Sequence, residues 1–365
     1  MEILEKAQAM QKSGEDVIHL EIGEPDFETP KCIEEAGLKA IREGKTRYTH
    51  SMGLLELREE ISGYYKKTYS VDISPEQVVV TSGTSPAMLL VFAAILEAGD
   101  GVVMPNPYYS CYPNFVKFFD ASPRFFDLFG SNGFTYDTEK INEKLTPKTR
   151  AVFINSPSNP TGMVIGKETL KEISELNNLI ISDEIYHGIT YGKPSHSILE
   201  FTNNAFVLNG FSKKYAMTGW RLGYLIAPRE FIRPIQKVAQ SFFISAAEFV
   251  QHAGIAALRH ADNDVSNMVE IYDARRKYMV SRLRETGFKI QKDPEGAFYV
   301  LADTREFESD SFKLALDILA HAKVAVTPGI DFGSAAEGYI RFSYANSMER
   351  ITEAMDRLNK FLNHR

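Results

Sequence analysis

The chain has 365 residues, of which 44% are hydrophobic and 24% are charged, and its formal net charge is −7. This composition is typical of a soluble globular protein with an extensive core, and the length favours two domains. The sequence has no basic block of the kind that binds nucleic acid, and its longest apolar run, 88–96, is too short to span a membrane.

From about residue 30 the chain alternates between predicted helices and apolar strands. Residues 1–13 are predicted to form a helix, and 17–22 a strand that leads into the loop 23–27. Short uninterrupted apolar runs are typical of strands covered on both faces. They recur at 78–81, 101–104, 151–154, 179–182, 205–208 and 222–227. A helix is predicted to follow the first of these runs, with Ser85 as its N-cap and Pro86 at its first position. The alternation predicts an α/β fold with a mostly parallel sheet flanked by helices.

The pattern changes in the last hundred residues. The predicted elements there are a helix over 265–285, paired strands over 288–291 and 297–301, a helix over 311–322, a strand over 339–343 and a helix over 348–362. We therefore expect a large domain over 30–262. The C-terminal part, 263–365, is expected to form a smaller α+β domain together with the N-terminal segment, 1–29.

Polar motifs follow four of the predicted strands directly. They begin at Ser82, Asn155 and Asp183, and the fourth contains Lys213. Ligands of open α/β sheets bind outside the carboxyl ends of the strands. The sequence therefore predicts one site built from all four motifs.

Several side chains of these motifs match the chemistry of one cofactor. Lys213 supplies an amine for a Schiff base and an acid–base group. Asp183 ends an apolar strand, where a carboxylate is costly unless it is paired, and it suits a protonated pyridine nitrogen. Tyr186 and Asn159 suit a phenolic oxygen. Taken singly, Asp183 would also make an ordinary helix cap, and the segment 159–162 an ordinary turn.

A phosphate site is predicted beside them. The backbone N–H groups and hydroxyls of Gly83, Thr84 and Ser85 open a helix, whose positive end attracts anions, and Arg221 suits a bidentate grip on phosphate. Tyr109 could stack on an aromatic ring, although it could equally be a core aromatic. Together these groups are what pyridoxal 5'-phosphate (PLP) needs from a protein, so a PLP enzyme is the leading hypothesis.

Arg341 lies inside the apolar strand 339–343. An arginine in such a place needs a buried anion. A substrate α-carboxylate fits this requirement, and a structural salt bridge is the alternative.

These residues resemble the fold-type I PLP-dependent aminotransferases of classes I and II, the aspartate-aminotransferase-like superfamily. The likeness runs from 22–27 to 339–345, and its most specific part is 212–221, in which the distance to Arg221 selects Lys213 over Lys214. The resemblance implies a catalytic set of Lys213, Asp183 and Tyr186. It implies a cofactor site of Gly83, Thr84, Ser85, Tyr109, Asn159, Asp183, Tyr186, Lys213 and Arg221, and a substrate site of Gly23, Asn159 and Arg341.

The resemblance also implies a homodimer with shared sites, because Tyr48 is similar to a tyrosine that reaches the partner subunit's phosphate. Two positions depart from patterns seen in parts of the family. Gly210 stands where some members carry a phosphate-binding serine, and Ser85 where one aspartate-specific subgroup carries a lysine. The arm before Gly23 is also short.

Three functions remain open at this point. The first is an aminotransferase that moves an amino group between an amino acid and a 2-oxo acid by a ping-pong mechanism. The second is a C–S β-lyase on the same fold, since both reactions begin by removing the α-proton. The third, a ligand-sensing protein without catalysis, is disfavoured because there is no room for a DNA-binding domain before Ile22.

The remaining residues give weaker indications. Cys32 and Cys111 cannot make a disulfide framework, which favours a reducing, cytoplasmic setting. The eight histidines show no metal-binding spacing, so no metal is expected.

Overall fold

A computed structural model describes residues 2–363. Its larger part is built on a seven-stranded sheet with the order β2-β8-β7-β6-β5-β3-β4. The strands are β2 (Val78–Thr81), β3 (Gly101–Asn106), β4 (Ser122–Asp127), β5 (Thr149–Asn155), β6 (Leu179–Asp183), β7 (Ala205–Gly210) and β8 (Gly223–Ile226). Neighbouring strands run parallel except where β8 pairs antiparallel with β2 and β7. The predicted mostly parallel sheet is confirmed.

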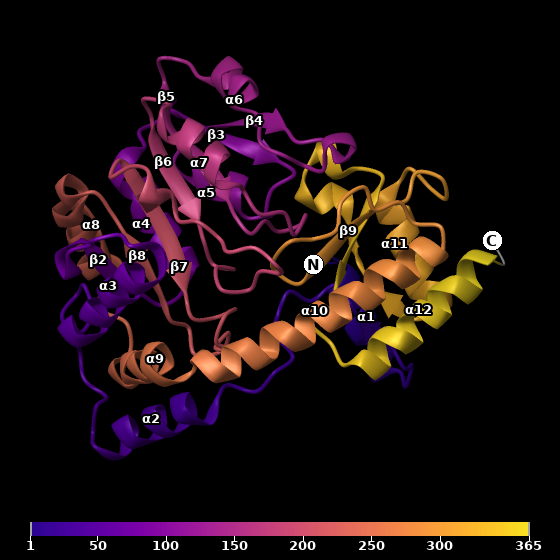
Figure 1. The fold of residues 1–365 in the computed structure, drawn as a ribbon, viewed down its shortest axis with the longest axis horizontal. Coiled ribbons are helices and arrows are strands. Elements are labelled where there is room, and N and C mark those ends of the chain that lie inside the picture. Colours follow the sequence, from indigo (N-terminus) through magenta and orange to yellow (C-terminus); the bar gives the residue numbers. More distant parts are fainter. Residues whose placement is uncertain (1, 364–365) are drawn as a thin grey trace.

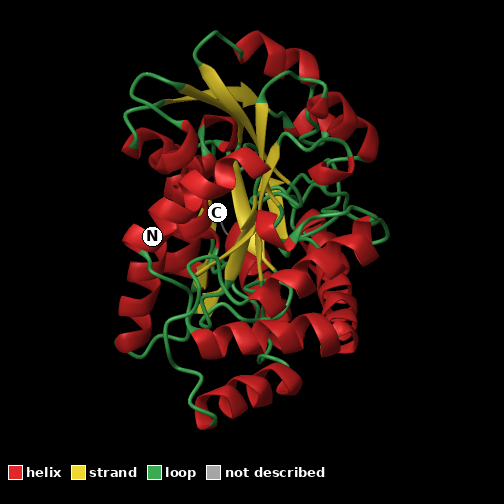
Figure 2. Ribbon diagram, turned by 90° about the vertical axis from the view of Figure 1, so that its left-hand side faces the viewer, coloured by secondary structure: helices red, strands yellow, loops and turns green. Residues whose placement is uncertain are grey.

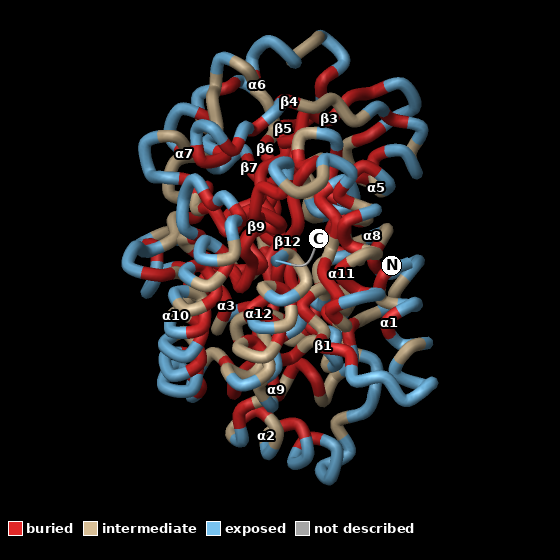
Figure 3. Tube along the Cα trace, turned by 90° about the vertical axis from the view of Figure 1, so that its right-hand side faces the viewer, coloured by how far each residue is buried: buried red, intermediate tan, exposed pale blue. Residues whose placement is uncertain are grey.

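Helices cover both faces of this sheet (Figure 2). The helices of this part are α3 (Leu55–Tyr69), α4 (Thr84–Ile95), α5 (Tyr112–Phe118), α6 (Thr138–Lys144), α7 (Lys167–Ser174), α8 (Arg229–Phe242) and α9 (Glu248–His260). A further helix, α2 (Lys31–Arg42), packs on α9 outside these layers (Figure 1). Successive strand residues point to opposite faces. In β5, Val152 and Ile154 therefore join one core cluster and Phe153 joins the other. The uninterrupted apolar strands follow from this double burial, which Figure 3 shows as buried chain through the sheet.

The smaller part combines the two ends of the chain. Its three-stranded antiparallel sheet has the order β11 (Thr327–Pro328), β12 (Tyr339–Ser343), β9 (Tyr299–Asp303). The N-terminal segment joins it through β1 (Ile18–His19), which pairs in parallel with β10 (Val324–Ala325). Its helices are α1 (Glu2–Lys12), α10 (Asp262–Glu285), α11 (Ser311–Ala322) and α12 (Met348–Asn363), and the short 3-10 helices of the chain are Pro75–Gln77, Gly130–Asn132, Ile198–Glu200, Gly329–Phe332 and Ser334–Ala336.

Helix α10 belongs to both parts. Figure 1 shows it extending from beside α9 into the region of α11 and α12. Near its start Val265 and Met268 pack in a core cluster of the large sheet, whereas Tyr272 and Met279 pack in the cluster around the small sheet. The expected domain limits near residues 29 and 262 stay a prediction.

Two of the predicted elements are wrong in detail. The strand expected over 288–291 is reduced to a single bridge between Lys289 and Asp303. The segment before β9 is instead held by Gly162, which accepts backbone hydrogen bonds from Glu295 and Gly296. The strand expected over 17–22 is only the two residues of β1.

The start of α4 is the third correction. The helix begins at Thr84 with Gly83 as its N-cap, so Ser85 and Pro86 lie inside the first turn. Gly83 has a φ of +97°, a conformation that glycine adopts without steric cost. Ser85 therefore lies two positions further into the helix than predicted, and the helix still begins directly after β2. In the described part of the chain, no helix has the length and apolarity needed to cross a membrane.

Candidate active site

The predicted site residues meet at the carboxyl ends of the parallel strands. Asp183 is the last residue of β6 and Asn155 the last of β5, while Lys213 follows the end of β7. Arg341 reaches the same place from β12 of the small sheet. The site therefore lies between the two parts of the molecule.

Lys213 is held by the N-terminal loop. Its Nζ donates a hydrogen bond to the backbone oxygen of Gly23 at 2.6 Å. Burial lowers the pKa of Lys213 to about 8, an effect that the nearby Glu24 opposes and Arg341 reinforces. Removing water from around an ammonium group favours the neutral amine. An amine that loses its proton this readily is suited to nucleophilic and acid–base work.

Asp183 is a buried carboxylate with two donors. The hydroxyl of Tyr112 donates to Oδ2 at 2.7 Å, and the backbone N–H of Ile185 donates to Oδ1 at 3.1 Å. Burial raises the pKa of Asp183 to about 6, although both hydrogen bonds oppose the rise. A cationic partner would offset the cost of burial. Sequence reasoning missed Tyr112, whose only sequence signal is its position one helical turn after Tyr109.

Two asparagines connect the strand ends. Asn155 donates from Nδ2 to the backbone oxygen of Asp183 at 3.0 Å and accepts at Oδ1 from the backbone of Asn159 at 2.9 Å. Asn155 thus fixes the turn that carries Asn159. The sequence motif contained Asn155, but its structural role was not foreseen because nothing in the pattern distinguishes it from a turn residue.

Arg341 makes no ion pair among the described residues. Its guanidinium donates to Asn159 Oδ1 at 2.9 Å, to the backbone oxygen of Glu21 at 2.5 Å and to Thr327 Oγ1 at 3.1 Å. Its Nε is buried without a hydrogen-bond partner in the described chain. A buried donor of this kind is costly unless a ligand satisfies it. The structural salt bridge that the sequence left open is therefore not what holds Arg341.

Tyr186 pairs with a tyrosine that sequence reasoning missed. The hydroxyls of Tyr186 and Tyr299 lie 2.7 Å apart, and both side chains are buried. The ring of Tyr299 also lies 4.3 Å from the guanidinium carbon of Arg341. Tyr299 is the first residue of β9, and its sequence context shows only an apolar strand.

The helix start and Arg221 lie side by side, as the predicted phosphate site requires. A Cβ added to Gly83 would lie 2.4 Å from an Arg221 guanidinium nitrogen, so only glycine allows the arginine to come this close. Arg221 donates to the backbone oxygen of Thr218 at 2.8 Å and is otherwise exposed. The first N–H groups of α4 have no partner within the helix. This arrangement leaves an anion-binding place between the helix and the arginine.

The two remaining tyrosines differ in their surroundings. Tyr109 is 38% exposed, and its ring meets that of Tyr112 edge to face at 5.4 Å. Tyr109 therefore presents part of its surface to the site. Tyr48 is 82% exposed, so it lies outside this buried site.

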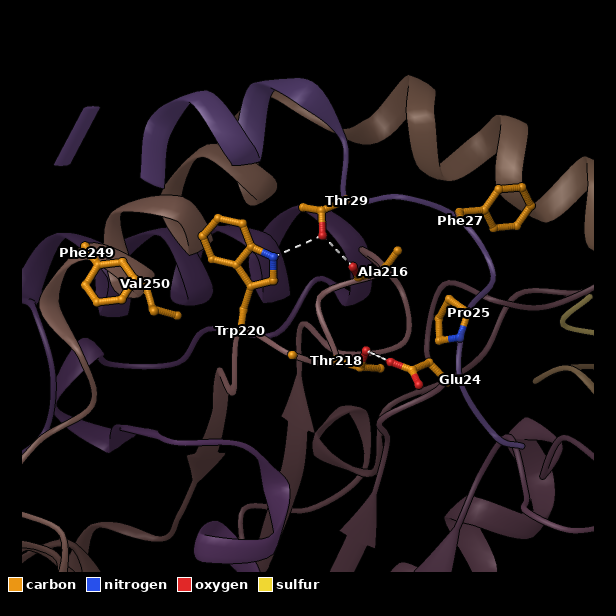
Figure 4. A pocket seen from close by; sticks show the side chains of 10 residues that line it. Glu24, Pro25, Phe27, Thr29, Ala216, Thr218, Trp220, Phe249 and Val250 are labelled. Carbon is orange, nitrogen blue, oxygen red and sulfur yellow. Dashed lines mark hydrogen bonds between the residues drawn. The ribbon is translucent and has the colours of Figure 1, made fainter. Parts of the chain in front are cut away.

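A pocket of about 440 Å³ lies on the outer side of the loop that follows Lys213 (Figure 4). Across it, Thr218 donates a hydrogen bond to Glu24. Thr29 donates to the backbone oxygen of Ala216 at 2.7 Å and accepts from the indole of Trp220 at 3.0 Å. These bonds fasten the N-terminal loop to the lysine loop. The lining of this pocket contains neither Lys213 nor Asp183, so the pocket is distinct from the predicted site.

The donor set fits pyridoxal 5'-phosphate. The amine of Lys213 suits the aldehyde of that molecule, and the buried carboxylate of Asp183 suits its pyridine nitrogen. The paired phenols of Tyr186 and Tyr299 suit its phenolic oxygen. Arg221, which lies against Gly83, suits its phosphate. The unpartnered Nε of Arg341 adds a place for a second anion.

Comparisons with known proteins agree with this arrangement. The family model described as aminotransferase class I and II matches residues 15–358. The (5-formylfuran-3-yl)methyl phosphate transaminase of Methanocaldococcus jannaschii is 43% identical, with 100% of this chain and 96% of that protein covered. The aspartate aminotransferase of Pyrococcus horikoshii is 42% identical over 99% of this chain and 93% of its own. The crystal structure of aspartate aminotransferase from Thermotoga maritima superposes with a TM-score of 0.94 at 38% identity, covering 100% of this chain and 96% of that one.

Proposed function

The chain belongs to the class I and II aminotransferases, which are PLP-dependent enzymes that act on amino acids and 2-oxo acids, and we propose a role for each residue of its site. When bound, the cofactor supplies an electron sink for the charge that develops at the substrate α-carbon. The protein's own groups then have three tasks. They hold the cofactor, bind the amino acid and move a proton.

Lys213 is the proposed covalent anchor and the acid–base group at the α-carbon. Its pKa of about 8 leaves a usable fraction of neutral amine near neutral pH. Asp183, oriented by Tyr112, is proposed to keep a proton on the pyridine nitrogen. Tyr186 and Asn159 are proposed to donate hydrogen bonds to the phenolic oxygen.

The proposed phosphate ligands are the helix start and one arginine. Gly83, Thr84 and Ser85 contribute the backbone N–H groups and hydroxyls at the start of α4, and Arg221 contributes a guanidinium. Tyr109 is proposed to stack on the ring from its partly exposed position.

The proposal that an amino-acid substrate binds at this site rests mainly on Arg341. Its buried, unpartnered Nε is the single observation that most favours an amino-acid carboxylate at this place. A carboxylate would accept a charge-assisted hydrogen bond there, which is stronger than a bond between neutral groups. Asn159 already accepts from the same guanidinium, and Gly23, the third proposed substrate contact, accepts from Lys213.

The test is a single-turnover half-reaction. The PLP-loaded protein is mixed with one amino acid at a time, and the cofactor is analysed by mass spectrometry. Aspartate comes first, because the Pyrococcus horikoshii relative is named an aspartate aminotransferase. Recovery of the aminated cofactor together with a 2-oxo acid supports transamination. Pyruvate and ammonia with unchanged cofactor would indicate the C–S lyase instead, which none of these comparisons favours.

We further propose a homodimer in which Tyr48 completes the partner's phosphate site. Its nearly complete exposure leaves the hydroxyl available for such a contact. A cytoplasmic setting is proposed on the strength of the two cysteines, both of which are free thiols.

A further inference from the structure

We propose that Tyr299 is a positioning residue for the transamination site, which aligns Tyr186 through its hydroxyl and Arg341 through its ring. This inference rests on the roles proposed above for those two residues. It would make one side chain of the small sheet responsible for both the cofactor's phenolic oxygen and the substrate's carboxylate.

The position of Tyr299 is fixed by the register of the small sheet. In the antiparallel pair of β12 and β9, Arg341 lies opposite Leu301, and Ser343 lies opposite Tyr299. Arg341 and Tyr299 are therefore diagonal neighbours on the same face, a spacing within reach of long side chains. Tyr299 is 1% exposed. Backbone pairing and burial together hold its ring in one place.

Once the cofactor is bound, the hydrogen bond between the hydroxyls of Tyr299 and Tyr186 can have only one donor. A phenol has a single hydrogen to donate. If Tyr186 gives its hydrogen to the phenolic oxygen, the 2.7 Å contact requires Tyr299 to be the donor to Tyr186. Each hydrogen bond in such a chain polarises the next and strengthens it. Tyr299 would therefore make Tyr186 a better donor.

The acidity of the two hydroxyls favours this direction. Burial raises the pKa of both, more strongly for Tyr186 than for Tyr299, and the positive charge of Arg341 partly offsets both rises. The hydroxyl with the lower pKa is the better donor, which is Tyr299. The other titratable groups that face Tyr186 and Lys213 are Tyr109, Asp183, Glu24 and Arg221.

The ring of Tyr299 has a separate task. The guanidinium carbon of Arg341 lies 4.3 Å from the centroid of Tyr299 and 4.9 Å from that of Phe332. Aromatic faces attract cations at such distances. These contacts orient the guanidinium while its Nε stays free for a ligand.

Gly23 gives independent support for the place of the hydroxyl. A Cβ added there would lie 2.3 Å from the Tyr299 oxygen. Any other residue at position 23 would displace the hydroxyl from Tyr186. The glycine is therefore needed for the tyrosine pair.

The first experiment titrates the visible absorbance of the PLP-loaded protein against pH without substrate. Tyr186→Phe removes a donor to the phenolic oxygen, so the apparent pKa of the change in the cofactor's absorbance should rise. Tyr299→Phe should raise it in the same direction by a smaller amount and should add nothing in the Tyr186→Phe background. Tyr344→Phe is the matched control, because it removes another buried hydroxyl of the same core, one that donates to Ala297. Its titration should match that of the wild type.

The second experiment separates hydroxyl from ring. Tyr299→Phe keeps the aromatic face, so KM for the amino acid should stay within about twofold of the wild type. Tyr299→Leu removes it, and KM should rise roughly 3- to 30-fold, as expected from losing a desolvated cation–π contact. Equal KM values for the two variants would overturn the role of the ring.

A Tyr299→Phe titration that coincides with the wild type, or that shifts equally with and without Tyr186, would overturn the role of the hydroxyl. Should Tyr299→Phe fail to fold, 3-fluorotyrosine at position 299 gives the same test with the opposite sign. Its more acidic hydroxyl is a stronger donor, so the apparent pKa should fall, and no fall would reject the proposal. Wild-type protein that never binds PLP would instead refute the proposed function.

Discussion

Arg341 and Lys213 donate hydrogen bonds to backbone oxygens only two residues apart, those of Glu21 and Gly23. One donor comes from the small sheet and the other from the loop after β7, so the short segment between the acceptors joins the two parts of the site. The segment therefore holds both side chains in place before a ligand binds, while the Nε of Arg341 stays without a partner in the described chain.

Lys213→Ala should abolish turnover and leave a folded protein that still binds PLP without a covalent bond. The phosphate and ring contacts come from other residues, whereas the covalent link depends on the lysine. Borohydride reduction followed by peptide mapping locates that link. Lys214 is the matched control, since its Nζ lies 4.5 Å from the centre of the Tyr64 ring. Label on Lys214 would reject the assignment.

Asp183→Ala should lower kcat by roughly 10²- to 10⁴-fold, the range typical of a lost acid–base group. The pyridine nitrogen would lose the carboxylate that keeps it protonated. Asp183→Glu should be less affected. Tyr112→Phe should retain most activity and shift the pH profile, because it removes only the hydrogen bond to Oδ2. Normal half-reaction rates in Asp183→Ala would show that Asp183 is not needed to keep the pyridine nitrogen protonated.

Arg341→Leu should chiefly raise KM for the amino acid. Losing one partner of a buried charged contact costs about 2–5 kcal/mol, which corresponds to roughly 30-fold or more in affinity. PLP affinity, measured by fluorescence titration, should be nearly unchanged. Arg305→Leu is the control, because that arginine is half-exposed and pairs with Asp303. If PLP affinity collapsed while KM held, Arg341 would be a cofactor ligand.

Mixing inactive Lys213→Ala with inactive Tyr48→Phe should restore activity under conditions of subunit exchange. A hybrid dimer would contain one site with both wild-type residues. Light scattering establishes the oligomeric state of each sample. A fully active, PLP-saturated monomer would contradict this prediction, and so would hybrids that stay inactive although Tyr48→Phe alone is severely impaired.

Stability should decline between about pH 4.5 and 8 because of Glu184. Burial raises its pKa from 4.5 to about 8 in the folded protein, so the folded state binds the extra proton. This contribution is fully present below pH 4.5 and is lost as the pH rises through 8. Urea unfolding of Glu184→Gln should show a flatter profile over that window. The control is Glu168→Gln, an exposed glutamate of α7, and parallel profiles for Glu184→Gln and wild type would refute the assignment.

The sequence predicted the parallel strands and the residues at their ends, because apolar runs and the motifs after them are both local signals. Tyr299 and Tyr112 could not be found in this way. Each acts through a contact with a residue more than seventy positions away in the chain, and such contacts depend on strand register and helix packing. The strand over 288–291 failed for a similar reason, since Gly162 competes for the backbone of the neighbouring segment.

The sharing of α10 between two core clusters has a calorimetric consequence. A 24-residue helix is about 36 Å long, and melting the whole helix removes packing from both clusters. The large and small parts should therefore unfold in a single heat-absorption peak, although each has a sheet of its own. Replacing Tyr272 with Ala would empty a buried site on the small-sheet side and should lower the temperature of the whole peak rather than split it.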